Sequence, residues 1–376
     1  MSERTLLTRL EELCNVDVDD ADHDFIRGLP FKPHNQTSNQ VVMTETMLLP
    51  RNRPLLLECI KKYGSQGWEA VFDEMSVRIC AENLPFITGR ALTQTTPRHL
   101  NDKDAIVDQC RRFAKSFEAA NVPRDRFAIK VPFSGAGAVA AKQLNAEGIR
   151  VLATAVFCLE QAIAASQSHC LFISPYYNGK RTSELESNFV DRDTEIAAHI
   201  DPSQRPNVKD SALEHPMSPR IIHILEAFTA LYKKTGEEQP IMVIASHFHN
   251  EELMAMAELG CQHVTIQQPR LKDLMAAKDN HPPVTRPKAT HPYATLSTPE
   301  RLRALSKLDP LAGTAWDGVL PAVNVDYLAA DGERLNRAIQ KDGVAAKRVK
   351  DAMDRFLDAE AKAKAAIEAE MQNLGL

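Results

Sequence analysis

The sequence predicts an α/β protein that folds as a single (β/α)₈ TIM barrel with an N-terminal helix and a C-terminal helical extension. Short apolar segments of β-like character alternate with helical segments along the chain, and eight such strand candidates are present. This alternation is typical of parallel sheets and favours a closed barrel, although a doubly wound open sheet gives a similar pattern. We expect one domain over residues 1–376, with the barrel core at about 13–270 and the helical extension at about 298–376.

The alternation is clearest between residues 126 and 176. Three β-like segments are separated there by two helical segments rich in small residues, and Gly148 provides a stop signal for the first helix. The predicted strands are 126–132, 149–157 and 170–177, and the predicted helices are 134–148 and 158–169.

The other strands are predicted on either side of this segment. Upstream candidates are 13–19, 37–43 and 89–94; downstream, a helix at 218–236 leads into a strand at 240–248, and a helix at 250–260 leads into a strand at 262–268. Three segments do not follow the alternation. They are a polar, acidic insertion at 182–217, a long loop rich in Pro, His and Lys at 269–297, and an Ala/Glu/Lys-rich tail at 331–376 that we expect to be helical and docked on the barrel.

Composition and charge exclude several classes of function. The net charge of −5 gives no electrostatic footprint for nucleic acid. No apolar run reaches the roughly 18 residues of a membrane-spanning helix, and the charged start "MSERTLLTRLEELC" does not read as a signal peptide, so we expect a cytoplasmic protein. The seven cysteines are scattered without a C-x-x-C pair, and we expect them to be reduced core residues.

Lys130 is the most informative single residue. It stands within "FAIKVPFSG" (127–135), at the end of a predicted buried strand. A lysine held among apolar groups loses hydration of its ammonium, so its pKa falls from about 10.4. A neutral amine at pH 7 attacks a ketone and forms a Schiff base, whose iminium is an electron sink for making or breaking a C–C bond. The alternative is a side chain that reaches past the strand end to solvent.

Polar residues recur at matched positions on the other predicted strands. In a (β/α)₈ barrel the chemistry takes place at the C-terminal ends of the strands, so these residues are candidates for the site. They are Asp19, Asn39, Gln94, Thr154, Ser174, Tyr176, Ser246, His247 and His249. The two histidines of "SHFH" also suggest a metal site, but no matching Asp, Glu or Cys cluster accompanies them.

The stretch from "IKVPFSG" to "SPYYNGKR" resembles the central segment of the transaldolase family. Shorter matches follow in the family's order: "VDDAD" (18–22), "TSN" (37–39), "GRALTQT" (89–95), "ASHFHN" (245–250) and "LGCQHVTIQQPRL" (259–271). The similarity covers roughly residues 10–275. It implies that Lys130 forms the Schiff base on the fourth barrel strand, that Asp19 is the catalytic aspartate and that Asn39 binds substrate. Asp17 and Asp20 are alternatives to Asp19.

Two departures from the family change the expected proton chemistry. Gln94 stands where transaldolases have a glutamate, and an amide cannot take up a proton. Tyr176 stands where they have a phenylalanine, with Tyr177 as the competing choice. The pair resembles the fructose-6-phosphate aldolase branch, in which a tyrosine acts with a water held by a threonine and a glutamine, here Thr154 and Gln94. Ser174, by contrast, is the same residue that transaldolases have at this position.

The family's phosphate contacts are also altered. "SPYYNGKR" is one residue longer than the family pattern, which leaves Lys180 or Arg181 as the anion contact. The second family arginine is missing, and His249 or His247 stands nearby. Leu152 replaces a family asparagine. Since histidine is a weaker and pH-dependent substitute for arginine, these changes predict altered phosphate recognition and a non-phosphorylated or unusual carbonyl substrate.

We therefore predict a transaldolase-like enzyme that transfers or cleaves a dihydroxyacetone unit between sugar or sugar-phosphate substrates. Lys130 is the nucleophile, Asp19 moves a proton, Tyr176 acts with the water of Thr154 and Gln94, and the predicted substrate contacts are Asn39, Ser174, Lys180, Arg181, Ser246 and His249. No metal or organic cofactor is expected, because the lysine supplies the electron sink, and a homodimer is left open. Two alternatives are a Schiff-base enzyme of specialised biosynthesis and a catalytically silent barrel subunit.

Overall fold

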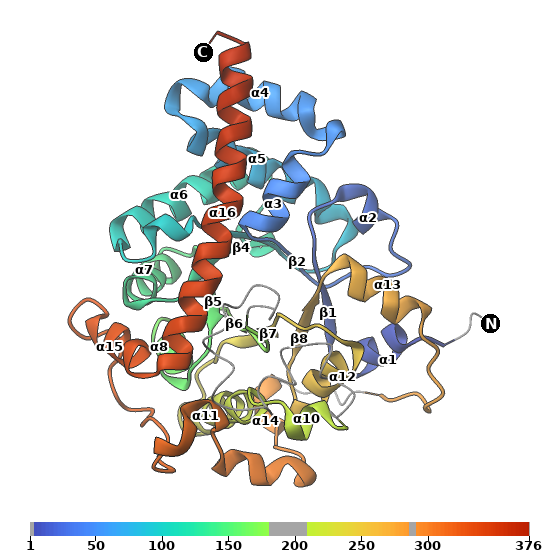
Figure 1. Cartoon of the computed structure of the whole chain (residues 1–376), viewed down its shortest axis with the longest axis vertical. Coiled ribbons are helices and arrows are strands. Elements are labelled where there is room, and N and C mark those ends of the chain that lie inside the picture. Colours follow the sequence, from blue (N-terminus) through green and yellow to red (C-terminus); the bar gives the residue numbers. More distant parts are fainter. Residues whose placement is uncertain (1–3, 180–208, 286–290, 376) are drawn as a thin grey trace.

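The computed structural model describes residues 4–179, 209–285 and 291–375 (Figure 1). Eight parallel strands close into a barrel in sequence order, with β8 pairing with β1, so the predicted (β/α)₈ architecture is confirmed. The strands are β1 Asn15–Asp19, β2 Gln36–Thr37, β3 Ala91–Gln94, β4 Phe127–Pro132, β5 Val151–Val156, β6 Phe172–Pro175, β7 Ile241–Ile244 and β8 His263–Ile266.

Helices surround the barrel and follow its strands. The α-helices are α1 Leu6–Leu13, α2 His23–Arg27, α3 Gln40–Met47, α4 Arg53–Tyr63, α5 Trp68–Asn83, α6 Lys103–Ala119, α7 Gly135–Ala146, α8 Leu159–Gln167, α10 Ser211–Glu214, α11 Ser218–Thr235, α12 Asn250–Leu259, α13 Gln268–Ala276, α14 Pro292–Thr295, α15 Glu333–Lys341 and α16 Gly343–Asn373. Short 3₁₀ segments are Pro50–Asn52, Gly64–Gln66, Leu84–Phe86, Pro97–His99, Arg124–Arg126, Glu300–Lys307 and Pro310–Ala315.

Local signals in the sequence explain several helix ends. The Ser134 hydroxyl accepts a hydrogen bond from the backbone N–H of Gly137 and caps α7. Gly236 and Gly260 follow α11 and α12 with φ of 71° and 97°, the left-handed conformation that glycine adopts without steric cost. These stops were predicted at the same glycines.

Two predicted elements are wrong. Only Gln36 and Thr37 of the predicted strand 37–43 are extended, because the Asn39 side chain accepts hydrogen bonds from the N–H groups of Val41 and Val42 and starts α3. The N-cap therefore outweighs the β propensity of two consecutive valines. The predicted loop 269–297 contains α13, which begins at Gln268 and has a proline in its first turn.

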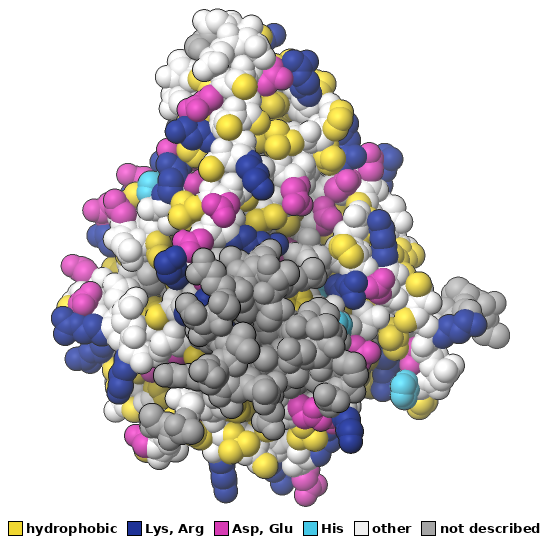
Figure 2. Space-filling view, in the orientation of Figure 1, with side chains coloured by type: hydrophobic (Ala, Val, Ile, Leu, Met, Phe, Trp, Pro, Cys, Tyr) yellow, Lys and Arg dark blue, Asp and Glu magenta, His cyan; other side chains and the backbone are white. Residues whose placement is uncertain are grey.

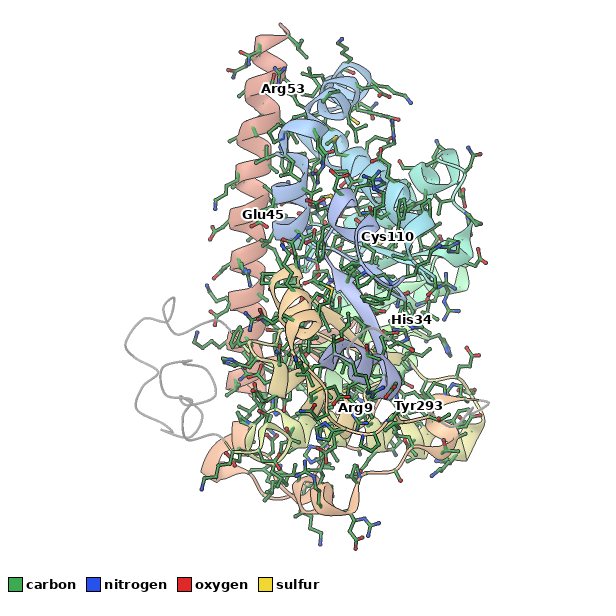
Figure 3. All side chains as sticks on the ribbon, turned by 90° about the vertical axis from the view of Figure 1, so that its right-hand side faces the viewer. Arg9, His34, Glu45, Arg53, Cys110 and Tyr293 are labelled. Carbon is green, nitrogen blue, oxygen red and sulfur yellow. The ribbon has the colours of Figure 1, made fainter. Side chains whose placement is uncertain are left out.

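The C-terminal tail is helical and docked on the barrel, as predicted. α16 runs across the barrel from the side of α8 and α15 to α4 (Figure 1), and Figure 3 shows it lying along one side of the molecule. Its N-cap Asp342 forms an ion pair with the buried Arg220 at 2.7 Å. Farther along, the carboxylate of Glu360 accepts hydrogen bonds from Thr96 and Arg98 at 2.8 and 2.9 Å. Carboxylates paired in this way fix the position of the helix.

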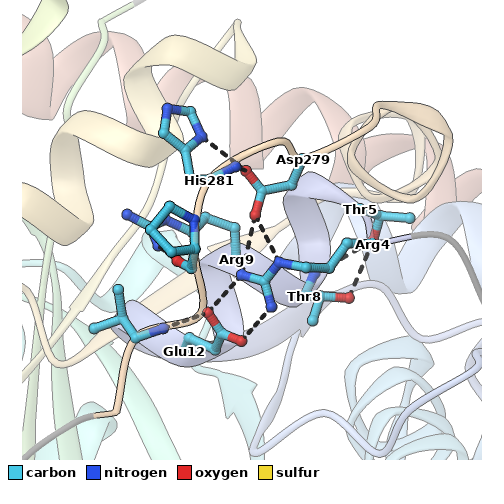
Figure 4. A network of polar contacts seen from close by, with 9 residues as sticks. Arg4, Thr5, Thr8, Arg9, Glu12, Asp279 and His281 are labelled. Atoms are coloured by element: carbon cyan, nitrogen blue, oxygen red, sulfur yellow. Dashed lines mark hydrogen bonds and ion pairs between the residues drawn. The ribbon is translucent and has the colours of Figure 1, made fainter.

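The N-terminal segment is tied to the chain that follows α13 (Figure 4). Arg4 pairs with Glu12 at 2.6 Å and with Asp279 at 3.0 Å, and Asp279 also contacts His281 at 2.8 Å. The backbone N–H of Leu6 donates to the carbonyl of Ala277. This network holds α1 against the barrel.

The surface carries charges of both signs, and the cysteines lie in the interior. Lys/Arg and Asp/Glu side chains are interspersed over the face shown in Figure 2, outside its grey region. Within the described ranges, no helix is long and apolar enough to cross a membrane. All seven cysteines are buried, and none of them forms a disulfide bond within the described residues. Of the predicted insertion 182–217, residues 209–217 are described and contain α10; the remainder lies outside the described residues.

Candidate active site

The inside of the barrel is layered along its strands. An apolar layer consists of Leu92, Ala128, Leu152, Phe172 and Val243. Side chains alternate along a strand, so the next inward positions toward the C-terminal ends lie two residues later. Those positions carry Gln94, Lys130, Thr154, Ser174 and Ala245. Four polar groups therefore lie on top of an apolar floor, which includes the Leu152 that replaces the family asparagine.

A pocket of about 290 Å³ opens above this polar layer. Its wall is formed by residues at strand ends and by one face of α16. The lining residues are Asp19, Asn39, Lys130, Phe157, Tyr176, Asn178, Gly179, Ala245, Ser246, His247, Phe248, Thr265, Gln267, Arg348, Asp351, Ala352, Arg355 and Phe356. The structure thus brings together predicted site residues from β1, the start of α3, β4 and the segments after β6 and β7.

Lys130 lies on β4 with its side chain buried at 4% exposure. Its amine has no hydrogen bond or ion pair with any described residue, and burial lowers its pKa while the charge of Asp19 acts in the opposite direction. Burial disfavours the charged ammonium, and no carboxylate of a described residue is close enough to form an ion pair with it. The pocket therefore holds a lysine amine that is easier to deprotonate than an ordinary one.

Asp19 is the carboxylate at the end of β1 that lines the pocket. Its Oδ1 accepts a hydrogen bond from the Thr37 hydroxyl at 2.8 Å. The two alternatives lie elsewhere: Asp17 is buried two residues earlier on β1 and bonded to Asn35, and Asp20 caps the turn at Asp22. Of the three acidic residues, Asp19 is the one placed to reach a bound substrate.

Tyr176 directs its phenol into the pocket from the end of β6. Its hydroxyl lies 3.1 Å from the Thr154 hydroxyl on β5. Burial raises the pKa of Tyr176 to about 12, so the phenol stays protonated near neutral pH. The competing Tyr177 is fully buried away from the pocket, where its hydroxyl contacts the carbonyl oxygen of Ser211 and the hydroxyl of Ser218.

Gln94 is adjacent to Lys130 in the register of β3 and β4, but its amide turns toward Gln40 of α3. Gln40 donates from Nε2 to the carbonyls of Gln94 and Thr95, so its Oε1 faces Gln94 and accepts from Gln94 Nε2 at 2.6 Å. This arrangement leaves Gln94 Oε1 buried without a hydrogen-bond partner in the described part of the chain. The sequence reading did not identify Gln40, which fixes the orientation of this amide.

The predicted substrate contacts differ in whether their polar atoms already form hydrogen bonds with described residues. Asn39 lines the pocket and uses Oδ1 to cap α3. Ser174 is buried beside Thr154 in the strand register, and its hydroxyl has no hydrogen-bond partner among the described residues. Ser246 lines the pocket but donates its hydroxyl to the carbonyl of Asn178 at 2.9 Å. Ser246 has φ of 64°, a strained value that the link to Asn178 stabilises.

Of the two histidines in "SHFH", the structure places His247 rather than His249 in the pocket wall. His249 begins α12. Both ring nitrogens of His247 lack a partner among the described residues, and burial lowers its pKa to about 3, so the imidazole is neutral at physiological pH. No group of three or more His, Cys, Asp or Glu side chains suited to a metal occurs in the part of the chain that is described.

The predicted anion contacts Lys180 and Arg181 lie outside the described residues. The cationic groups that do line the pocket besides Lys130 are Arg348 and Arg355 of α16. The sequence reading assigned them no role, because nothing local to α16 shows that it crosses the barrel. Their spacing of seven residues, which puts them on one helix face, was the available signal.

Comparisons with known proteins show which proteins this chain resembles. A family profile described as "Transaldolase/Fructose-6-phosphate aldolase" matches residues 16–367. "Transaldolase 1" of Pectobacterium atrosepticum is 28% identical over 346 residues, covering 89% of this chain and 96% of the relative. "Transaldolase" of Methylococcus capsulatus is 26% identical over 74% of this chain and 80% of its own, and "Transaldolase" of Methylobacillus flagellatus is 26% identical over 73% and 80%.

Proposed function

The chain belongs to the transaldolase/fructose-6-phosphate aldolase family, and we propose that it forms a Schiff base between Lys130 and a ketose and transfers or cleaves a dihydroxyacetone unit. The observation that carries this proposal is Lys130 itself, a buried and unpaired amine with a lowered pKa in the wall of a pocket. A lysine in this state is the nucleophile that class I aldol chemistry needs.

In the first step the neutral amine of Lys130 adds to the ketose carbonyl and gives a carbinolamine. Loss of water then gives the iminium, and the leaving hydroxyl needs a proton. Asp19 supports this transfer because it lines the same pocket and is oriented by Thr37. A carboxyl group held in one orientation moves a proton efficiently to and from a bound intermediate.

In the second step the C–C bond between the carbon next to the iminium carbon and the following, hydroxyl-bearing carbon breaks. Its electron pair passes toward the iminium to give an enamine, and the hydroxyl loses its proton as the carbon that carries it becomes an aldehyde. Tyr176, bonded to Thr154, relays this proton through a water held between Thr154 and the free Oε1 of Gln94. Because the phenol is protonated at neutral pH, it also returns a proton to the enamine when no acceptor is present.

Substrate hydroxyls are bound by groups whose hydrogen-bonding capacity is not fully used by the described residues. Asn39 uses its Oδ1 to cap α3, which leaves Nδ2 to donate to the substrate. The Ser174 hydroxyl, beside Thr154 in the register, has no described partner. We include Ser246 and the neutral His247 as contacts to uncharged parts of the ketose, since both line the pocket.

The test is borohydride trapping with dihydroxyacetone and with fructose 6-phosphate, followed by peptide mass mapping. We expect an adduct on Lys130 in the wild type, none in Lys130→Met, and an unchanged adduct in Lys142→Met, which removes an exposed lysine of α7. The absence of an adduct on Lys130 with every ketone tried contradicts the proposal. Adding erythrose 4-phosphate distinguishes transfer, which consumes the acceptor, from simple cleavage.

A further inference from the structure

α16 contributes one continuous face to the pocket. Arg348, Asp351, Ala352, Arg355 and Phe356 line it, and their spacing of three, four, seven and eight residues from Arg348 corresponds to one side of a helix. α16 lies across the barrel in Figures 1 and 3 and is anchored by Asp342 and Glu360 on either side of this face. The arginines on it are therefore held at the pocket by a rigid element.

Arg348 is buried at 8% exposure without a carboxylate partner among the described residues. Among the described residues, its one hydrogen-bond contact is a weak one, from Nη1 to the Sδ of Met217 at 3.9 Å. The nearest carboxylates are engaged by other cations: Asp342 pairs with Arg220 at 2.7 Å, and Asp351 pairs with Lys347 at 2.7 Å. A buried guanidinium is costly unless an anion pairs with it, so this position is complete only with a negative group in the pocket.

Burial and the charge of Arg220 lower the pKa of Arg348 to about 10, which still leaves it charged at neutral pH. Arg355 lies two helical turns farther on, is exposed, and has no ion pair with a described residue. Arg355 lines the same pocket as the Tyr176 phenol. Two cations without a counter-ion among the described residues thus face one pocket.

We propose that Arg348 and Arg355 of α16 form an anion subsite for a phosphate or carboxylate at the end of the substrate remote from its carbonyl. The proposal rests on the proposed function, because Lys130 fixes where the carbonyl end lies. It moves the anion contact from the strand-end loops to the C-terminal helix. Guanidinium groups bind the oxygens of phosphate and carboxylate with two parallel hydrogen bonds, which suits a terminal anionic group.

The first experiment measures the ketose concentration that gives half-maximal borohydride trapping on Lys130. Fructose 6-phosphate, a ketose with a terminal carboxylate, and uncharged fructose are compared with dihydroxyacetone. In the wild type we expect one of the anionic ketoses to trap at lower concentration than fructose, and which of them does so identifies the anion. We expect Arg348→Gln and Arg355→Gln each to weaken that preference roughly ten- to hundredfold. Trapping with dihydroxyacetone is expected to change little.

The matched control is Lys350→Gln, which removes one positive charge from α16 where the lysine is exposed and paired with Asp354. It is expected to keep the preference for the anionic ketose. Arg348→Lys retains a charge but loses the planar fork, so it is expected to be intermediate. Arg355 is exposed, so its variant keeps the test usable if Arg348→Gln does not fold.

A second measurement does not depend on Lys130 chemistry. Inorganic phosphate is expected to raise the melting temperature of the wild type and of Lys130→Met, but much less that of Arg355→Gln. If Lys130 traps dihydroxyacetone while neither arginine variant changes the anionic preference or the phosphate effect, the anion subsite is refuted and the proposed function stands. The anion subsite is also refuted if both arginine variants of α16 keep the preference for the anionic ketose while Arg181→Gln loses it. If no ketone is trapped while phosphate stabilisation depends on Arg355, the proposed function fails and the anion subsite remains.

Discussion

At the N-terminal ends of the strands, buried polar groups are paired with one another. The carboxylate of Asp17 accepts hydrogen bonds from the backbone N–H and the Nδ2 of Asn35 and from Nδ1 of His263, all within 3.0 Å. At the C-terminal ends, by contrast, Lys130 and Arg348 lack a counter-ion, and both ring nitrogens of His247 lack a partner, among the described residues. Unpaired buried polar groups destabilise a protein, so they persist where a ligand uses them.

The largest effect is expected at Lys130. Lys130→Met is expected to lower turnover on the order of 10⁴-fold or more, because the nucleophile is lost. Its thermal stability is expected to be unchanged or higher, since an apolar side chain replaces an unpaired buried amine. Steady-state kinetics and thermal unfolding measure the two effects. A large loss of stability instead indicates that the Lys130 amine has a structural partner. That result contradicts the difference between the N-terminal and C-terminal ends of the strands.

Tyr176→Phe is expected to slow C–C cleavage roughly 10²- to 10⁴-fold, because the proton relay is lost. Trapping of dihydroxyacetone on Lys130 is expected to continue, since the first step uses Asp19. Rapid-quench measurement of cleavage beside the trapping assay separates the steps. Tyr177→Phe, the neighbouring phenol outside the pocket, serves as the control for cleavage. Near-normal cleavage in Tyr176→Phe contradicts the assignment.

His263, which is partly buried, and His247, which is buried, allow the comparison to be made with one type of substitution. His263→Leu is expected to lower the free energy of unfolding by about 2 kcal/mol, because Asp17 loses a hydrogen-bond donor. His247→Leu is expected to change it by less than about 1 kcal/mol, because no hydrogen bond to a described residue is lost. Urea unfolding measures both. Equal destabilisation by the two substitutions argues against a difference between the two ends of the barrel strands. A KM that rises in His247→Leu but not in His263→Leu supports that difference.

Much of the site was predictable from the sequence because its residues interrupt apolar patterns. Lys130 and Thr154 stand out within strands that are otherwise apolar, and the period of two along a strand places them in one layer. Asn39 was placed in a strand because two valines follow it, whereas the structure uses it to cap a helix. The residue was identified, but its local conformation was not.

The parts that were missed depend on tertiary contacts. Arg348 and Arg355 belong to a charged helix whose pattern fits any solvent-exposed surface, and they reach the pocket because α16 docks across the barrel. Gln40 matters because its amide orients Gln94 across two elements. The seven-residue spacing of the two arginines places them on one helix face, but nothing within either segment shows what that face or the Gln40 amide contacts.

The central claim is that burial without a partner keeps Lys130 reactive, and a titration of its amine tests this most directly. The rate of modification of Lys130 by an amine-reactive reagent, followed by peptide mass mapping, is expected to rise with pH around a midpoint below 10.5. Asp19→Asn is expected to lower the midpoint further, because the Asp19 charge raises the pKa of Lys130. Lys350, whose pKa is raised by its hydrogen bond to Asp354, is the internal reference and is expected to have a higher midpoint than an ordinary lysine. A midpoint for Lys130 at or above that of Lys350 contradicts the account.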